Sequence, residues 1–286
     1  MPVVVVTDSS ARIPAQLAAE SGIRIVPLHV IVDGRDFRDG IDDVPVDLYT
    51  KGSATTAGAT PEELASVYRT ALACSAGDGV VAVHISRYLS STLNTAEQAA
   101  REFDGMVRVI DSRSAGMGIG YVALAASRAA DDGADLNTVA VSADSVVRET
   151  SAHIVVRRLD NLRRSGRIGA AASWLGTALA VKPVLRIDDS GRLVLAQRVR
   201  TTSRAVTTMV EQVLEVVGER RARLAVHHVD DLDGAAQIAA TLASALPACG
   251  PAIITDLGPV LGVHVGAGAL GVVVQLRDTV VQLPDR

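Results

Sequence analysis

The sequence predicts a two-domain α/β protein, and three observations support this prediction. Short aliphatic runs alternate with helix-like segments over the first half of the chain, which is typical of a parallel sheet flanked by helices. From about residue 145 the pattern changes and includes a hairpin. The length of 286 residues suits two domains of moderate size. We therefore expect an N-terminal α/β domain over residues 1–145 and a C-terminal α/β domain with a mixed sheet over residues 146–286.

The N-terminal half is expected to alternate strands with helices. The expected strands are the apolar runs at residues 3–6, 23–32, 80–85 and 107–110. The expected helices cover residues 14–21, 60–74, 89–103 and 118–130. Thr60 and Glu63 have capping-box spacing with Pro61 at the first helical position, which marks a helix start. Asp33 and Gly34 predict a turn after the second strand.

The C-terminal half is expected to be more mixed. Residues 184–187 and 192–196 predict a hairpin across the turn at residues 188–191. Residues 160–167 read as a basic loop. The other expected strands are residues 154–156, 224–228, 252–255 and 271–276. The expected helices are residues 170–180, 203–217 and 232–246.

Composition excludes several classes of protein. Aromatic residues make up only 2% of the chain and the net charge is −4, so neither base stacking nor a field that attracts polyanions is available, and nucleic acid is not an expected partner. Two cysteines are too few for a disulfide framework. The N-terminus lacks a basic leader region, and no apolar run reaches the length of a membrane span. We expect a cytoplasmic protein without a transmembrane segment.

Hydroxyl-rich loops are expected at the ligand-binding edge of the first sheet. Residues 7–10, 86–92 and 111–114 follow expected strands and contain several serine and threonine residues. In open α/β sheets the loops at the carboxyl ends of the strands hold the ligand. A polar ligand group is therefore expected there.

His264 stands among glycines in an apolar run near the C-terminus. Glycine allows a ligand or another part of the backbone to come close. One interpretation is a buried core histidine on a strand; the other is an imidazole that contacts a ligand. The sequence at this point leaves both open.

Three further motifs have simpler explanations. Residues 266–271 match G-x-G-x-x-G, but a strand-like run follows where a dinucleotide site needs a helix. The glycines at 116, 118 and 120 have the wrong spacing for that site and predict close helix–sheet packing. His227 and His228 could suggest a metal, but neighbouring strand residues point to opposite faces. Asp230 or Asp231 is expected to cap the following helix. No metal site is expected.

An acyl-ester hydrolase is the alternative function from a different class. Ser86, Ser90 or Ser91 could supply a nucleophile and His264 the base, and Ser90 or Ser91 with His264 is the pair we consider. The chain lacks the G-x-S-x-G elbow, and no acidic residue stands out as a partner of the histidine.

Six segments taken together resemble the DegV family of bacterial fatty-acid-binding proteins. Their order spans nearly the whole chain, over about residues 3–280. They are VVTDSS at residues 5–10, LSSTLNTA at 89–96, VIDS at 109–112, LRRSGRI at 162–168, KPVL at 182–185 and GPVLGVHVG at 258–266. The resemblance implies two α/β domains with one long-chain fatty acid in a slot between them, and no other cofactor.

The resemblance also implies a role and a set of site residues. Members of the best-understood type are the acyl-binding subunit of a fatty acid kinase and present the carboxylate to a separate ATP-binding subunit. The carboxylate-binding threonine, serine and histidine correspond to Thr56, Ser90 and His264, with Ser91 contributing its backbone. Arg163, Arg164 and Arg167 correspond to a docking face for the kinase. The chain departs from the family pattern at residues 57–59, where Ala, Gly and Ala replace Ser, Gln and Pro, and at Ser91 and Ala267.

Physical chemistry is compatible with this role. A buried carboxylate needs several hydrogen-bond donors, and hydroxyls, a backbone N–H and an imidazole can supply them. No lysine or arginine is required, so the polar end of the slot is expected to be nearly neutral. We expect a carrier that performs no chemistry itself, with transient contact to a membrane surface as one open possibility.

Overall fold

The computed structural model describes residues 2–45, 47–49, 54–168 and 181–277. Its first half contains the predicted parallel sheet, in the order β2-β1-β6-β7. The strands are β1 (Val4–Asp8), β2 (Arg24–Val26), β6 (Val80–His84) and β7 (Val107–Asp111). The two central strands, β1 and β6, are mostly aliphatic and are buried on both faces, as expected of parallel strands covered by helices.

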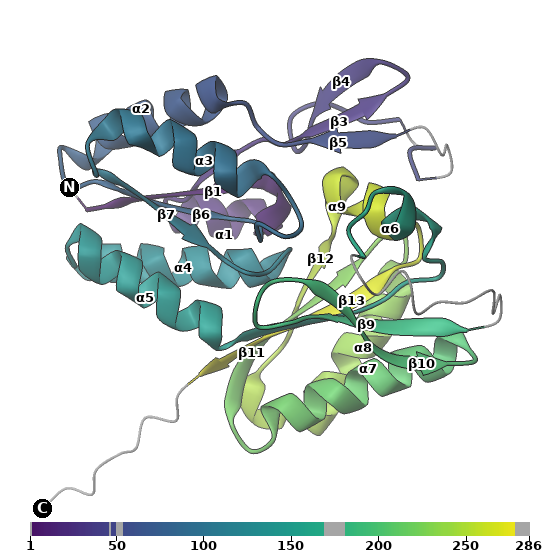
Figure 1. Ribbon diagram of the computed structural model, residues 1–286. Helices are drawn as coiled ribbons and strands as arrows, with labels where there is room; N and C mark the ends of the chain where they lie inside the picture. Colours follow the sequence, from purple (N-terminus) through teal and green to yellow (C-terminus); the bar gives the residue numbers. More distant parts are fainter. Residues whose placement is uncertain (1, 46, 50–53, 169–180, 278–286) are drawn as a thin grey trace, which may run out of the picture.

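Helices cover both faces of this sheet (Figure 1). One face carries α2 (Pro61–Ser75) and α3 (Thr92–Ala100), and the other carries α1 (Ala15–Glu20), α4 (Met117–Asp131) and α5 (Leu136–Arg148). The capping box predicted at Thr60 and Glu63 is present, with both reciprocal hydrogen bonds. A 3₁₀ turn, η1 (Ser9–Ala11), follows β1, and another, η2 (Arg101–Phe103), follows α3.

The single strand expected at residues 23–32 is wrong, because the chain forms two strands there. β2 ends at Val26, and β3 (His29–Val32) belongs to a separate antiparallel sheet with β4 (Arg35–Arg38) and β5 (Thr55–Ala57), in the order β4-β3-β5. Pro27 separates the two strands, and proline has no N–H to continue a ladder. The predicted turn at Asp33 and Gly34 is confirmed, and both residues have positive φ, as a two-residue hairpin requires.

The second half forms the predicted mixed sheet, in the order β10-β9-β8-β13-β11-β12. Only β11 and β12 are parallel; the other neighbours are antiparallel, including the predicted β9–β10 hairpin. The strands are β8 (Thr150–Val155), β9 (Lys182–Ile187), β10 (Leu193–Val199), β11 (Arg221–His228), β12 (Ile253–Asp256) and β13 (Leu270–Arg277). The outer face carries α7 (Thr202–Val217) and α8 (Leu232–Ala245), followed by η4 (Pro247–Cys249).

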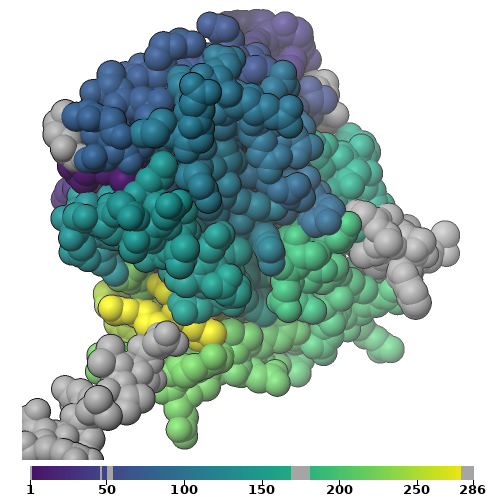
Figure 2. Space-filling view, turned by 60° about the vertical axis from the view of Figure 1, so that its left-hand side comes forward, coloured from purple at the N-terminus to yellow at the C-terminus, as the bar shows by residue number. Residues whose placement is uncertain are grey.

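The two halves form successive layers that share α4 (Figure 1). One side of α4 packs on β1 and β6, and the other contacts β13 and β8. The core around α4 includes Ala225 and Val273 of the second sheet. The space-filling view shows the blue and teal residues of the first half resting on the green and yellow residues of the second (Figure 2). A ligand between the halves would therefore lie along the seam beside α4.

The middle of the chain departs from the sequence expectations at α5 and at α6 (Asp160–Arg164). Helix α5 was not predicted; Asp135 caps it through the Thr138 N–H, and it crosses the expected boundary at residue 145. The basic loop expected at residues 160–167 is partly wrong, because α6 forms there. The helix expected at residues 170–180 lies outside the described residues. No helix in the described parts of the chain is long and apolar enough to cross a membrane.

Candidate functional site

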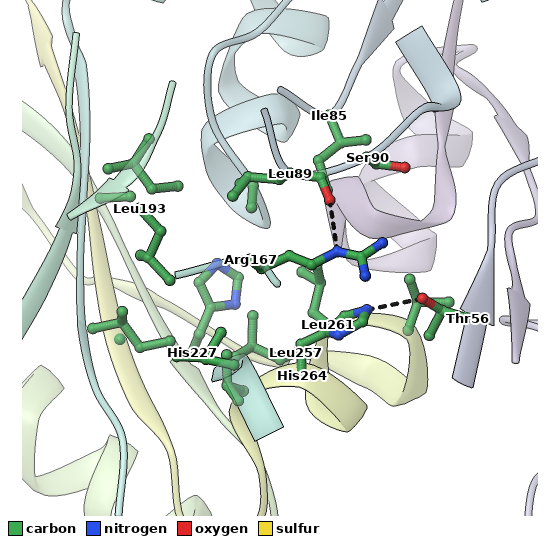
Figure 3. Close-up of a pocket in the computed structure, with 18 of the residues that line it drawn as sticks. Thr56, Ile85, Leu89, Ser90, Arg167, Leu193, His227, Leu257, Leu261 and His264 are labelled. Atoms are coloured by element: carbon green, nitrogen blue, oxygen red, sulfur yellow. Dashed lines mark hydrogen bonds between the residues drawn. The ribbon is translucent and has the colours of Figure 1, made fainter. Parts of the chain in front are cut away.

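A cavity of about 390 Å³ lies between the two halves of the molecule. Its walls are mainly aliphatic and come from both halves. The apolar lining includes Leu28, Ile85, Leu89, Leu193, Leu257 and Leu261. The polar lining includes Thr56, Ser90, Ser91, Arg167 and His264 (Figure 3). A mostly apolar pocket with a few convergent polar groups is typical of a small-molecule site.

Thr56 and His264 meet at the polar end of this cavity. Thr56 lies in β5 and His264 in α9 (Gly258–Val265), yet Thr56 Oγ1 and His264 Nε2 are hydrogen-bonded at 2.8 Å (Figure 3). The other ring nitrogen, Nδ1, is buried and has no hydrogen-bond partner within the described residues. Burial, with a smaller contribution from the charge of Arg167, lowers the pKa of His264 to about 4. The imidazole is therefore neutral near pH 7.

The interpretation of His264 as a core histidine on a strand is wrong about the strand, because the residue lies near the end of helix α9. Pro259 stands in the first turn and Gly266 ends the helix with a positive φ, both favourable positions. The nearby glycines serve packing rather than the imidazole. A Cβ at Gly262 would lie 2.5 Å from Cε1 of Tyr49, so a glycine is needed for α9 to approach that ring.

Ser90 and Ser91 lie at the N-terminus of α3. Ser91 is the N-cap residue, and Ser90 Oγ accepts a hydrogen bond from the Thr92 N–H at 3.2 Å. Gly58 of the preceding segment packs tightly here, since a Cβ on it would lie 2.7 Å from Thr92 Oγ1. A helix N-terminus carries free N–H groups and a partial positive charge. This end of the cavity is therefore suited to an anion.

Arg167 lies at the same polar end, and the expectation of a nearly neutral end is wrong. Its Nε donates to the Leu89 carbonyl oxygen at 3.3 Å and its Nη1 to the Ser165 carbonyl oxygen at 2.6 Å. The guanidinium lies between Ser90 on one side and Thr56 with His264 on the other (Figure 3). The sequence placed this arginine with Arg163 and Arg164 on an outer surface. Those two are exposed on α6, whereas Arg167 lines the cavity.

Sequence and structure comparisons agree on one family. The sequence profile of the family described as "Uncharacterised protein, DegV family" matches residues 2–277. The chain belongs to the DegV family. A DegV domain-containing protein of Mycobacterium tuberculosis is 58% identical over 276 residues, which are 96% of this chain and 98% of the relative. Another, from Streptomyces coelicolor, is 38% identical over 279 residues, with 96% and 99% covered.

Solved structures of DegV proteins share the fold. A Thermus thermophilus protein, described under "Fatty Acid Binding of a DegV family Protein", superposes with a TM-score of 0.90 at 32% identity, covering 97% of this chain and all of that one. A Bacillus subtilis protein, described as "DegV, a fatty acid binding protein", has a TM-score of 0.87 at 28% identity, with 97% and 100% covered. The predicted family and two-domain fold are thus confirmed.

His227 of this DegV protein is a site residue that sequence reasoning missed. The residue lies in β11 and faces the cavity (Figure 3). Its Nε2 accepts the Met117 N–H at 2.9 Å, and its Nδ1 donates to the Thr255 carbonyl oxygen at 3.3 Å. Burial lowers the pKa of His227 to about 4, so the ring is neutral. The sequence showed a histidine pair but gave no sign that the N-terminus of α4 would reach one member.

The other motifs behave as packing and capping elements in the DegV fold. A Cβ at Gly116 would lie 2.7 Å from His227 Nε2, which confirms the close packing predicted for these glycines. Asp231 caps α8 by accepting the Gly234 N–H, as expected of this residue or its neighbour. The G-x-G-x-x-G match leads into β13 rather than a helix. Among the described residues, no three His, Cys, Asp or Glu side chains are grouped as metal ligands would be.

The geometry required for a serine hydrolase is not formed by these residues. Ser90 Oγ bonds to Thr92 Oγ1 at 2.9 Å, while His264 Nε2 bonds to Thr56. A nucleophile needs a direct hydrogen bond to its base, and the base needs a third group to orient it. His264 Nδ1 has no carboxylate partner in the described part of the chain. The arrangement suits binding better than catalysis.

Proposed function

We propose that this DegV protein binds one long-chain fatty acid in the cavity between its halves, with the carboxylate at the polar end. The observation that carries the proposal is that a single cavity has mainly aliphatic walls and one polar end. Thr56, Ser90, Arg167 and His264 form that polar end. The Thermus thermophilus and Bacillus subtilis relatives, whose descriptions state fatty-acid binding, support it.

The carboxylate would be bound through a relay of donors. When the neutral His264 donates its Nε2–H to Thr56 Oγ1, the threonine hydroxyl proton is left to donate into the cavity. Chained hydrogen bonds of this kind strengthen one another in a low-dielectric site. Ser90 Oγ and the Ser91 N–H provide donors from the opposite loop, and Arg167 provides the charge that balances the carboxylate.

The tail supplies most of the affinity. The cavity volume of about 390 Å³ lies within the range of about 300–1,000 Å³ that is typical of small-molecule pockets. Burying about 14 methylenes at about 0.8 kcal/mol each gives an upper bound of about 11 kcal/mol. The polar groups then fix which end of the molecule faces α9 and α3.

We further propose that the protein presents this carboxylate to a separate ATP-dependent kinase. Arg167 lines the cavity, where it can contact the carboxylate. It also follows α6 directly, and α6 carries Arg163 and Arg164 on its exposed surface, where a partner could dock. A positively charged edge beside the carboxylate suits a partner that delivers a phosphoryl group. The carrier itself needs no nucleophile or base.

Titration of delipidated protein with palmitate tests the binding site. Thr56→Val keeps the shape and removes the hydroxyl, and should weaken binding by about 1–2 kcal/mol, or roughly 5- to 30-fold. Thr70→Val is the matched control, since Thr70 lies exposed on α2 and donates only to the Ser66 carbonyl. Equal palmitate affinity in both variants would contradict the assignment of Thr56.

Incubation with a bacterial fatty acid kinase subunit and ATP tests presentation. The loaded protein should support formation of acyl phosphate, trapped as the hydroxamate, and Arg163→Glu with Arg164→Glu should slow it without changing palmitate affinity. Palmitate binding with no acyl phosphate from any such kinase would retain the carrier proposal and overturn the kinase role.

A further inference from the structure

A second cavity, of about 340 Å³, lies further along the same seam. It is formed by α1 and α4 from the first half and by β11 and β12 from the second. Arg223 and His227 lie four residues apart on β11 and so point to the same face of the strand. The second cavity thus lies beyond His227, on the side away from the N-terminus of α4. It shares no lining residue with the first cavity.

Arg223 is a half-buried cation without a partner in the described residues. No hydrogen bond or ion pair joins its guanidinium to any group within residues 2–45, 47–49, 54–168 and 181–277. Burial and the positive charges of Arg128 and Arg277 lower its pKa. Taking a charge out of water without a counter-ion costs free energy. Such an arrangement favours an anion brought in from outside.

Tyr121 provides a second, independent sign of a ligand. Its side chain lines the cavity from α4 and is only 1% exposed. The phenolic hydroxyl is buried and has no hydrogen-bond partner in the described structure. A buried hydroxyl is almost always paired in folded proteins. Arg223 lines the same cavity and is near enough for its charge to act on the Tyr121 phenol, so one acceptor group within reach of both would satisfy both.

The rest of the lining limits the charge and shape of the ligand. Glu20 and Asp131 are exposed at the cavity and add negative charge, which disfavours a multiply charged anion. Leu17, Leu124 and Ile253 line the remaining walls. The Ser127 hydroxyl is already used, because it donates to the Ser21 carbonyl oxygen at 2.7 Å. The cavity therefore favours one oxyanion on a short apolar body.

We propose that this cavity is a second binding site, in which Arg223, Arg128 and Tyr121 hold the head group of an amphipathic monoanion. The head group is an oxyanion, either a carboxylate or a phosphodiester. The apolar body rests on Leu17, Leu124 and Ile253. The site is separate from the fatty-acid cavity and does not depend on the function proposed for it.

The stability of the free protein separates a ligand site from a structural arginine. If Arg223 supports the fold, replacing it should lower the midpoint of thermal unfolding. If Arg223 instead serves to bind an anion, Arg223→Gln removes an uncompensated charge from the free protein and leaves that midpoint unchanged or higher. Tyr121→Phe removes the unpaired hydroxyl and should behave in the same way.

Titration with defined probes tests binding directly. Protein loaded with palmitate, so that the first cavity is filled, is titrated by calorimetry with hexanoate and, separately, with dibutyl phosphate at constant ionic strength. We expect saturable binding of at least one anion, and the two arms tell a carboxylate site from a phosphodiester site. Arg223→Gln should weaken it by about 10- to 100-fold, the range of a lost charge-assisted hydrogen bond.

Matched controls decide the outcome. Hexan-1-ol has the apolar body without the charge and should not bind measurably. Arg101→Gln removes an exposed arginine on η2 of the first half and should leave binding unchanged. The proposal is overturned if neither anion binds at millimolar concentration, if Arg223→Gln binds as the wild type does, or if that substitution lowers the unfolding midpoint of the free protein.

Discussion

His227 Nε2 accepts the backbone N–H of Met117 at 2.9 Å, and this bond joins the two halves of the molecule. Met117 begins α4, whereas His227 lies in β11 of the second sheet. The bond requires a neutral imidazole, because the accepting nitrogen must carry no proton. The N-terminus of a helix also disfavours a positive charge. The seam beside the ligand cavity therefore depends on the protonation state of one buried histidine.

The first prediction concerns pH. The pKa of His227 is about 4 in the folded protein, against about 6.5 in an unfolded chain. As pH falls from about 6.5 to 4 the unfolded chain takes up the proton first, so the free energy of unfolding falls, by up to about 3 kcal/mol for this group. His227→Gln can keep both hydrogen bonds without titrating. Urea unfolding at several pH values should show that the free energy of unfolding falls less steeply with decreasing pH in this variant than in the wild type. The same pH dependence in both proteins would contradict the role assigned to His227.

The second prediction concerns Gly116, which packs on the His227 ring. It has φ of 60° and ψ of −144°, a region that side chains avoid, and a Cβ there would lie 2.7 Å from the imidazole. Gly116→Ala should lower the free energy of unfolding by about 2–4 kcal/mol. Gly133 also has a positive φ but has open space around its Cβ position, so Gly133→Ala should cost only about 1 kcal/mol. Equal losses would show that contact with His227 is unimportant.

The third prediction concerns Arg12 of the first half, which contacts the segment just before α9. Its Nε donates to the Asp256 carbonyl oxygen at 2.9 Å, and its Nη1 lies 3.3 Å from the buried Asp39 carboxylate. Burial raises the pKa of Asp39 and Arg12 opposes that rise. Arg12→Ala leaves this carboxylate buried without a counter-ion, and should cost about 3 kcal/mol of stability near pH 7.

The loss in Arg12→Ala should shrink as pH falls and Asp39 becomes protonated. Arg69→Ala is the control, because Arg69 and Glu102 form an exposed pair at 3.9 Å that contributes less than about 1 kcal/mol. Chemical denaturation at pH 7 and at pH 5 measures both effects. A loss in Arg12→Ala that is no larger than in Arg69→Ala, or that grows toward pH 5, would refute the proposed role of Arg12 as the counter-ion of Asp39.

The fourth prediction separates the charge of Arg167 from its shape. Arg167→Gln should weaken palmitate binding by about 10- to 100-fold, because the carboxylate loses a charge-assisted partner. Binding of hexadecan-1-ol, which has the same tail without a charge, should change far less. Competitive titration of both ligands gives the comparison. A loss of the same size for acid and alcohol would assign Arg167 a packing role only.

Much of the fold could be predicted from local signals. The capping box at Thr60, the turn at Asp33 and Gly34, and the buried strands followed by hydroxyl-rich loops each have a local physical cause. Helix α5 was missed because its valines favour a strand, and tertiary packing of its apolar face on α4 decides the outcome. One of the two interpretations of His264 put it on a strand for the same reason.

The candidate site was harder to predict than the fold. The residues that matched family motifs, Thr56, Ser90, Ser91 and His264, do line one cavity. His227 carried no comparable signal, and the motif that contains Arg167 pointed to a docking face rather than to the cavity. The positions of both residues depend on how α4 and the chain after α6 pack against segments far away in the sequence. The spacing of arginines along a chain also does not show which of them turns inward.

Mass spectrometry of the protein as purified tests the central claim most directly. Protein produced in bacteria and purified without detergent is denatured and extracted with organic solvent, and the extract is compared with that of Thr56→Val. We predict close to one long-chain fatty acid per wild-type chain and a clearly lower amount in the variant. A wild-type extract without fatty acid, together with no palmitate binding by the same preparation, would contradict the account.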